Sequence, residues 1–211
     1  MADTALPWSR TSLPRGLMLR RAAPLALCVA AAVLMFAPDR SAGDSDDAWT
    51  ALAKGGHVAV IRHGNAPPGH GGDPPGWRMD DCTTQRNLDD IGRGQARALG
   101  EAFRTHGVRV DRIVASPMCR CRETGELMAL GAVETSWALL PATGPSPTRF
   151  SELKELVSTW RGPGVLVLVT HAMTIGPLTG FLPEQAEVVV LQPEPGNPRG
   201  GSLVARIAPP R

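Results

Sequence analysis

Three apolar runs of the sequence predict strands, and each is followed, directly or after a few residues, by histidine or arginine. Arg62 and His63 follow the first run, Arg120 comes shortly after the second, and His171 follows the third. In open α/β sheets, ligands bind beyond the carboxyl ends of the strands, so these side chains are expected at one rim. Arginine presents a planar fork of donors that suits phosphate, and histidine supplies a nucleophilic nitrogen or a further donor. The four residues therefore predict a pocket for a phosphoryl group.

Residues near this set add expected contacts to a phosphorylated ligand. Gly64 has no side chain and allows a ligand to approach the backbone closely. The segment 64–84 is rich in Gly, Pro and Asp and is too long for a plain connection, which indicates a functional loop. Asn65, Gln85 and Arg86 flank this loop, and we expect them to contact the phosphate or the leaving group.

The elements that must position these residues alternate along the chain. Apolar runs bounded by turn residues predict strands at 57–61, 113–115, 133–137, 165–169, 188–191 and 203–207. Helical spacing of apolar residues predicts helices at 49–54, from 87 or 89 to 107, and at 119–130, 149–160 and 173–182. This alternation predicts an α/β fold, a three-layer α/β/α sandwich with a mostly parallel sheet and a possible antiparallel edge from the last two strands.

Composition narrows the class of protein. The chain has 211 residues, of which 43% are hydrophobic and 20% charged, and these values suit one globular domain. A net charge of +2 without a run of basic residues argues against binding to DNA or RNA. The cysteines and histidines lack the spacing of zinc ligands, so we expect neither a metal nor a cofactor.

The N-terminus has the pattern of an export signal. An apolar run at 24–37 is too short for a membrane span and is followed by small residues, and it is preceded by the basic residues Arg10, Arg15, Arg20 and Arg21. We therefore expect residues 1–42 to be a signal peptide and residues 43–211 to be an exported, periplasmic domain. The alternative is an uncleaved segment that anchors the domain to the membrane.

Three cysteines remain after the expected cleavage. In an oxidising compartment Cys82 pairs with either Cys119 or Cys121, which leaves one odd thiol. The alternative is three reduced cysteines without a shared role. Spacing alone leaves the connectivity open.

Several motifs, in this order along the chain, resemble those of the histidine phosphatase superfamily, which has the phosphoglycerate-mutase-like fold. They are Arg62-His63-Gly64, Ser116-Pro117-x-x-Arg120 and Thr170-His171, and the segment 88–96 is similar to the L-x-x-x-G-x-x-Q-A signature. The resemblance extends from about residue 56 to the C-terminus. Segments 81–88 and 119–121 look like an exported bacterial subgroup that includes the lipopolysaccharide-core heptose phosphate phosphatase.

The resemblance implies a phosphomonoesterase. By this analogy His63 attacks phosphorus, Arg62, Arg120 and His171 hold the phosphate oxygens, and water hydrolyses the phosphohistidine. The implied substrate is a small-molecule or envelope-linked phosphate. The oligomeric state is not predicted.

One family feature is missing. Many members carry a glutamate as general acid after the third strand, but the segment 140–147 has no carboxylate. Asp81 and Glu123 are the replacements that we consider, or else the leaving group needs little help from an acid. The absence leaves open a binding module that recognises phosphate without catalysis. A phosphoglycerate-mutase-type phosphotransferase is a weaker alternative.

Overall fold

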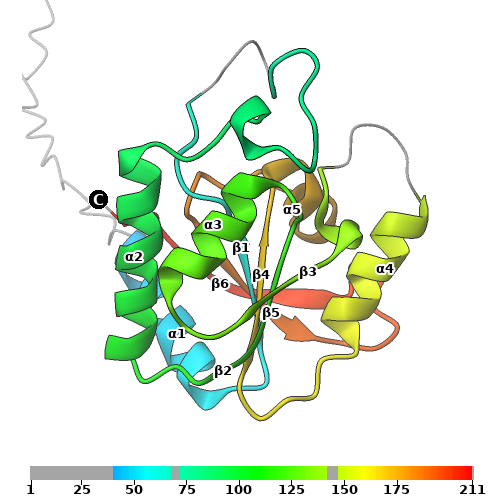
Figure 1. Cartoon of the computed structure of the whole chain (residues 1–211). Helices are drawn as coiled ribbons and strands as arrows, with labels where there is room; N and C mark the ends of the chain where they lie inside the picture. Colours follow the sequence, from blue (N-terminus) through cyan, green and yellow to red (C-terminus); the bar gives the residue numbers. More distant parts are fainter. Residues whose placement is uncertain (1–39, 68–71, 142–146, 211) are drawn as a thin grey trace, which may run out of the picture. The chain divides into compact units, whose positions relative to one another are not determined.

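Six strands form one sheet in the order β3-β2-β4-β1-β5-β6 (Figure 1). The computed structural model describes residues 40–67, 72–141 and 147–210. The strands β3, β2, β4 and β1 are parallel, whereas β5 and β6 form the antiparallel edge. The six strands are β1 (Val58–Arg62), β2 (Val110–Ala115), β3 (Val133–Thr135), β4 (Val165–Thr170), β5 (Val188–Pro193) and β6 (Gly201–Ile207).

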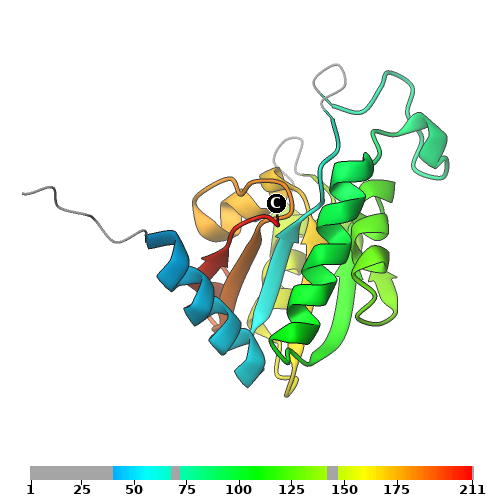
Figure 2. The same cartoon turned by 90° about the vertical axis from the view of Figure 1, so that its left-hand side faces the viewer.

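Five α-helices cover the two faces of this sheet (Figures 1 and 2). Apolar side chains of α1, α2 and α3 share one core with one face of the strands, and those of α4 and α5 share a second core with the other face. The predicted three-layer α/β fold is thereby confirmed. The helices are α1 (Arg40–Lys54), α2 (Asp90–Thr105), α3 (Cys119–Met128), α4 (Pro147–Ser158) and α5 (Ala172–Thr179).

Strand β4 shows why the sheet needs cover on both sides. All six of its residues are buried, with Val167 and Val169 in the first core and Leu166 and Leu168 in the second. Successive side chains of a strand point to opposite faces, so a continuous apolar run supplies both cores. This run was the predicted central strand, and it pairs with β1 and β2.

Helix α1 differs most from its predicted bounds, whereas the other elements differ by up to three residues at an end. Helix α1 begins at Arg40 instead of residue 49. Its first turns contain small and polar residues without a helical pattern of apolar residues, whereas Ala48 and Leu52 further along pack into the core. Strand β3 ends at Thr135, where Ser136 caps a 3-10 helix at Trp137–Leu139.

The predicted signal peptide lies almost wholly outside the described residues. Its expected end at residue 42 falls inside the first turn of α1. Within the part of the chain that the structure describes, no helix combines the length and the apolar character needed to cross a membrane.

Candidate active site

The ends of three parallel strands meet at one edge of the sheet. Arg62 at the end of β1 lies opposite Thr170 at the end of β4. The backbone N–H of His63 donates to the Thr170 carbonyl at 3.0 Å, and that of Ser116 donates to the Val169 carbonyl at 2.9 Å. Sheet hydrogen bonds therefore bring together the strand-end residues that the sequence places far apart.

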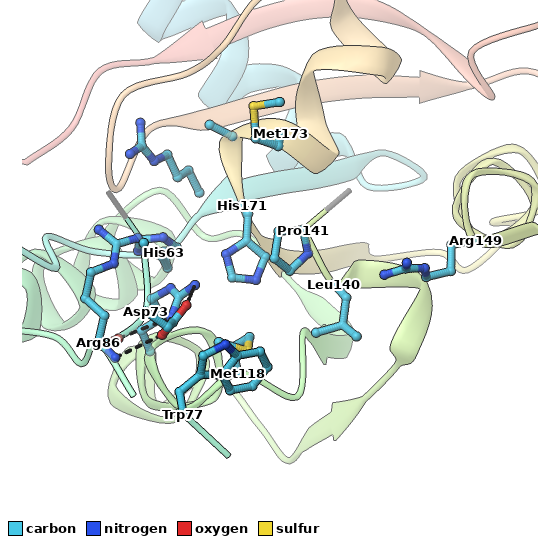
Figure 3. A pocket seen from close by; sticks show the side chains of 14 residues that line it. His63, Asp73, Trp77, Arg86, Met118, Leu140, Pro141, Arg149, His171 and Met173 are labelled. Atoms are coloured by element: carbon cyan, nitrogen blue, oxygen red, sulfur yellow. Dashed lines mark hydrogen bonds and ion pairs between the residues drawn. The ribbon is translucent and has the colours of Figure 1, made fainter. Parts of the chain in front are cut away.

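A pocket of about 500 Å³ opens at this edge (Figure 3). It contains all four predicted catalytic residues and a mixed wall of cationic, apolar and aromatic side chains. Its volume lies within the range of small-molecule sites. The lining residues are Arg62, His63, Gly72, Asp73, Trp77, Arg86, Met118, Arg120, Leu140, Pro141, Arg149, His171, Ala172 and Met173.

His63 is held as a neutral imidazole. Its side chain is buried, and Nδ1 lies 2.8 Å from the carbonyl oxygen of Gly64. A carbonyl only accepts hydrogen bonds, so Nδ1 carries the proton and Nε2 keeps its lone pair. Burial, helped by the positive charges of Arg120, Arg86 and Arg62, lowers the pKa of His63 to about 3, against an opposing contribution from the Gly64 carbonyl. At neutral pH the imidazole is therefore uncharged.

His171 lies beside His63 at the start of α5. The two ring centroids are 5.4 Å apart with the rings in an edge-to-face arrangement. His171 Nε2 lies 3.0 Å from the hydroxyl oxygen of Ser116. Burial lowers the pKa of His171 well below its usual value, and the neighbouring His63 and Arg120 lower it further. His171 is thus a second neutral imidazole in the pocket.

Of the four arginines that line the pocket, Arg62, Arg86 and Arg120 place their positive charges near the two imidazoles. Arg62 donates through Nη1 to the Pro183 carbonyl at 2.8 Å, and Arg86 donates through Nη1 to the Ala66 carbonyl at 2.8 Å. The Nε atoms of Arg62, Arg86 and Arg120 are buried and lack an acceptor among the described residues. Buried donors without partners are costly, and an oxyanion in the pocket would satisfy them.

Asp73 is a pocket residue that the sequence analysis missed. Its Oδ1 accepts a hydrogen bond from Arg120 Nη1 at 2.8 Å, and its Oδ2 accepts one from Arg120 Nη2 at 3.2 Å. Oδ1 also accepts from the backbone N–H of Arg86 at 2.9 Å. A carboxylate inside the predicted functional loop was the available signal, but the loop contains several, and spacing does not show which one turns inward.

Three predicted ligand contacts lie outside the pocket and serve the scaffold instead. Gly64 is needed for close packing, because a Cβ there would lie 2.6 Å from the carbonyl oxygen of Gly92. Asn65 donates through Nδ2 to Asp89 Oδ2 at 2.6 Å. Gln85 is buried and accepts from the backbone N–H of Cys119 at 3.0 Å. Of the four predicted substrate-binding residues, Arg86 alone lines the pocket.

The two predicted general acids also lie outside the pocket. Asp81 accepts from the backbone N–H of Thr83 at 3.0 Å and so caps the short 3-10 helix at Cys82–Thr84. Glu123 accepts from Arg93 Nε at 2.6 Å on the outer side of α3. Both are helix-associated carboxylates with structural partners, and neither lines the pocket. Their positions do not support either residue as the general acid, and the assignment stays a prediction.

The structure pairs Cys82 with Cys119, and Cys121 is a buried free thiol. The disulfide joins the loop before α2 to the first residue of α3. Arg120 therefore follows a covalently tethered residue, and Arg86 lies within the segment that the disulfide closes. Burial raises the pKa of Cys121 to about 12, so its thiol is neutral beside His171.

Comparisons with known proteins agree with this architecture. Residues 58–140 match the profile of the histidine phosphatase superfamily, branch 1. The fold is similar to a protein histidine phosphatase SixA complexed with tungstate (TM-score 0.53, 16% identity, covering 72% of this chain and 96% of that chain). No curated protein matches the chain.

Two further solved structures have the same fold. One is a putative phosphohistidine phosphatase SixA from Nakamurella multipartitia, with a TM-score of 0.52 and 22% identity over 74% of this chain and 96% of that one. The other is the open reading frame Rv3214 of Mycobacterium tuberculosis, with a TM-score of 0.53 and 16% identity over 72% and 97%. At these identities the likeness concerns the fold alone.

Proposed function

We propose that this chain, whose residues 58–140 match the histidine phosphatase superfamily, is a member of that superfamily and a phosphomonoesterase that works through a phosphohistidine on His63. The observation that carries the proposal is the hydrogen bond from His63 Nδ1 to the Gly64 carbonyl. This bond leaves the Nε2 lone pair in a pocket lined by arginines. A neutral imidazole attacks phosphorus well, and nearby cations stabilise the transferring phosphoryl group.

The reaction proceeds in two steps. His63 Nε2 attacks phosphorus, and the bond from phosphorus to the ester oxygen breaks with its electron pair on the leaving oxygen. Water then attacks the phosphohistidine, and the electron pair of the P–N bond returns to Nε2. Arg62, Arg86, Arg120 and His171 surround the non-bridging oxygens in both steps. The products are an alcohol and inorganic phosphate, with His63 restored.

The lining of the pocket supports a small phosphate ester as substrate. Beyond the arginines, the wall continues with Trp77, Met118, Leu140 and Met173, which offer apolar and aromatic contact to a leaving group. A volume of about 500 Å³ accommodates a group of the size of a sugar or a small aromatic ring.

The proposal is tested with an activated aryl phosphate, whose leaving group departs without an acid. The wild-type domain should release phosphate on the order of 10⁴-fold faster than the His63→Ala variant. Rapid quenching should trap an acid-labile phosphoenzyme in the wild type only. Equal rates in the two proteins, together with retained phosphate binding, would instead identify a binding module. Transfer of phosphate to an added alcohol without net release would identify a phosphotransferase.

The proposed export also has structural support. A disulfide persists in oxidising compartments such as the periplasm, and the described chain contains one. Expression of the full chain in a Gram-negative host should yield a periplasmic protein that has lost about 42 residues from its N-terminus, as measured by intact mass. A full-length protein in the membrane fraction would support the anchored alternative.

A further inference from the structure

Asp73 is the single carboxylate among the described residues that line the pocket. The same pocket holds two histidines and four arginines. The Asp73 side chain is 12% exposed, and that of its partner Arg120 is 3% exposed. Figure 3 shows the carboxylate between the His63 side of the pocket and the wall formed by Trp77 and Met118. A single carboxylate among four arginines would weaken the binding of an anion, so its presence indicates a function that Asp73 performs in the pocket.

The bonds of Asp73 place it next to the expected position of phosphate. Both Nη groups of Arg120 donate to its carboxylate, which is the paired geometry that an arginine also offers to phosphate. A bound phosphoryl group therefore competes for the same two donors. Oδ1 of Asp73 has a second donor in the backbone N–H of Arg86, which keeps the carboxyl beside the phosphate after the exchange.

The other pocket groups are poor proton donors. Burial lowers the pKa of His171, so its imidazole has no extra proton at neutral pH. Arginine does not release its proton in proteins. The Cys121 thiol has its pKa raised to about 12 by burial and does not line the pocket. Asp81 and Glu123 lie outside it. Among the described residues that line the pocket, Asp73 therefore remains as the candidate proton donor.

We propose that Asp73 is the acid and base of the reaction, an inference that rests on the phosphatase function proposed above. Phosphate takes over the Arg120 donors, and the displaced carboxyl group accepts a proton, because two adjacent anions repel each other. At neutral pH a fraction of the phosphate monoester still has its second ionisable proton, and this proton moves to the Asp73 carboxyl group. The sequence lacks the family glutamate in 140–147, and Asp73 fills its role from a different loop.

The proton balance closes over the two steps. When the P–O bond breaks, the proton of the Asp73 carboxyl group moves to the leaving oxygen, which departs as an alcohol. The resulting carboxylate accepts a proton from the water that attacks the phosphohistidine. Inorganic phosphate then takes this proton back from the Asp73 carboxyl group and leaves as dihydrogen phosphate with the oxygen of that water. The Asp73 carboxylate returns to Arg120.

The test measures the Asp73→Asn variant with two phosphate esters that differ in their leaving group. Asparagine keeps the size and an acceptor for Arg86 but donates no acidic proton. With an alkyl phosphate, kcat/KM should fall about 100-fold or more, whereas with dinitrophenyl phosphate it should change less than about threefold. The Asp73→Glu variant should recover part of the alkyl phosphate activity.

Asp81→Asn is the matched control, since it makes the same change in the same loop outside the pocket. It should leave both rates unchanged. Both esters are assayed on one preparation, so their ratio does not depend on the folded fraction.

Three results would overturn the assignment. An equal loss of Asp73→Asn activity on both esters would show a structural role. An equal gain in the activity of Asp73→Asn on both esters, with tighter inhibition by tungstate, would show that Asp73 only competes with phosphate for Arg120. A wild type that hydrolyses dinitrophenyl phosphate no faster than His63→Ala would remove the phosphatase function itself, and the acid role with it.

Discussion

The pocket is built from two regions that are held in different ways. The strand-end residues Arg62, His63 and His171 are fixed by backbone bonds of a buried sheet, such as that from His63 N–H to Thr170. Asp73 is held by side-chain bonds to Arg120 and to the backbone of Arg86, and Arg86 lies within the segment closed by the Cys82–Cys119 disulfide. Cooperative sheet packing fixes the nucleophile, whereas a few polar contacts and one covalent bond fix the loop. In the proposed mechanism, the sheet therefore holds the nucleophile and the loop holds the proposed acid.

Arg120 is where the two regions meet, and changing it should have a large effect on activity. Arg120→Lys keeps the charge but loses the fork that binds Asp73 and phosphate, so kcat/KM should fall about 100-fold. Arg122→Lys makes the same change two residues later, outside the pocket, and should alter kcat/KM less than about threefold. Steady-state kinetics on one aryl phosphate measures both. Similar losses in the two variants would contradict the assigned position of phosphate.

Breaking the disulfide should affect the loop far more than the sheet. The bond closes a segment with a sequence separation of 37. By loop-closure entropy, the double variant Cys82→Ser/Cys119→Ser should lose about 2 to 4 kcal/mol of unfolding free energy. The loop groups Asp73 and Arg86 should lose order first, so KM should rise more than kcat falls. Urea denaturation and kinetics measure the two effects. A reductant should lower the unfolding free energy and raise the KM of the wild type in the same way, and it should leave the double variant unchanged. If a reductant changes neither quantity in the wild type, the disulfide does not order the loop.

The strand-end histidines should make stability depend on pH. Burial first, and then the arginines, lower the pKa of His63 to about 3 in the folded state, and burial lowers that of His171 as well. The unfolded chain has histidine pKa values of about 6.5 and binds more protons below that pH. Unfolding free energy should therefore decrease as pH falls from 6.5 toward 5, by up to about 1.4 kcal/mol per pH unit for each histidine.

The control for this prediction is His63→Asn, which should remove about half of the slope between pH 5 and 6.5. Denaturant titrations at several pH values measure it. An unfolding free energy that is flat across this window in the wild type would show that the two imidazoles are not kept neutral by the fold.

The smallest expected effect concerns Glu123 on the outer side of α3. Its ion pair with Arg93 is partly exposed, with side-chain exposures of 30% and 36%. Glu123→Gln should therefore change the unfolding free energy by less than about 1 kcal/mol and leave kcat/KM unchanged. Thermal denaturation and the aryl phosphate assay measure this. A marked loss of activity would reinstate Glu123 as an acid and weaken the case for Asp73.

Much of the fold and part of the site could be predicted because they depend on local pattern. The apolar run of β4 predicts a doubly covered strand, and parallel strand ends must meet at one edge. This reasoning placed Arg62, His63, Arg120 and His171 in one pocket, where the structure also has them. The start of α1 and the end of β3 were wrong, because caps and small residues blur element boundaries.

The loop residues could not be assigned in the same way. Asn65 and Gln85 have polar side chains that suit phosphate, yet packing directs them to Asp89 and to the backbone of Cys119. Asp81 and Asp73 have the same chemistry in one loop, and only the folded path turns Asp73 toward Arg120. A loop has no repeating geometry from which side-chain direction follows.

The sequence by itself determined the layered α/β architecture and the rim of histidines and arginines, because hydrophobic periodicity and strand ends are encoded over short stretches. Only the tertiary structure decided which tautomer His63 adopts, which cysteines pair and which carboxylate enters the pocket. The cysteine pairing and the choice of carboxylate depend on contacts between residues tens of positions apart, such as the 47 positions between Asp73 and Arg120. The tautomer of His63 depends on how the fold directs the carbonyl of the next residue, Gly64. Such contacts form only when the sheet is assembled and the loop is folded.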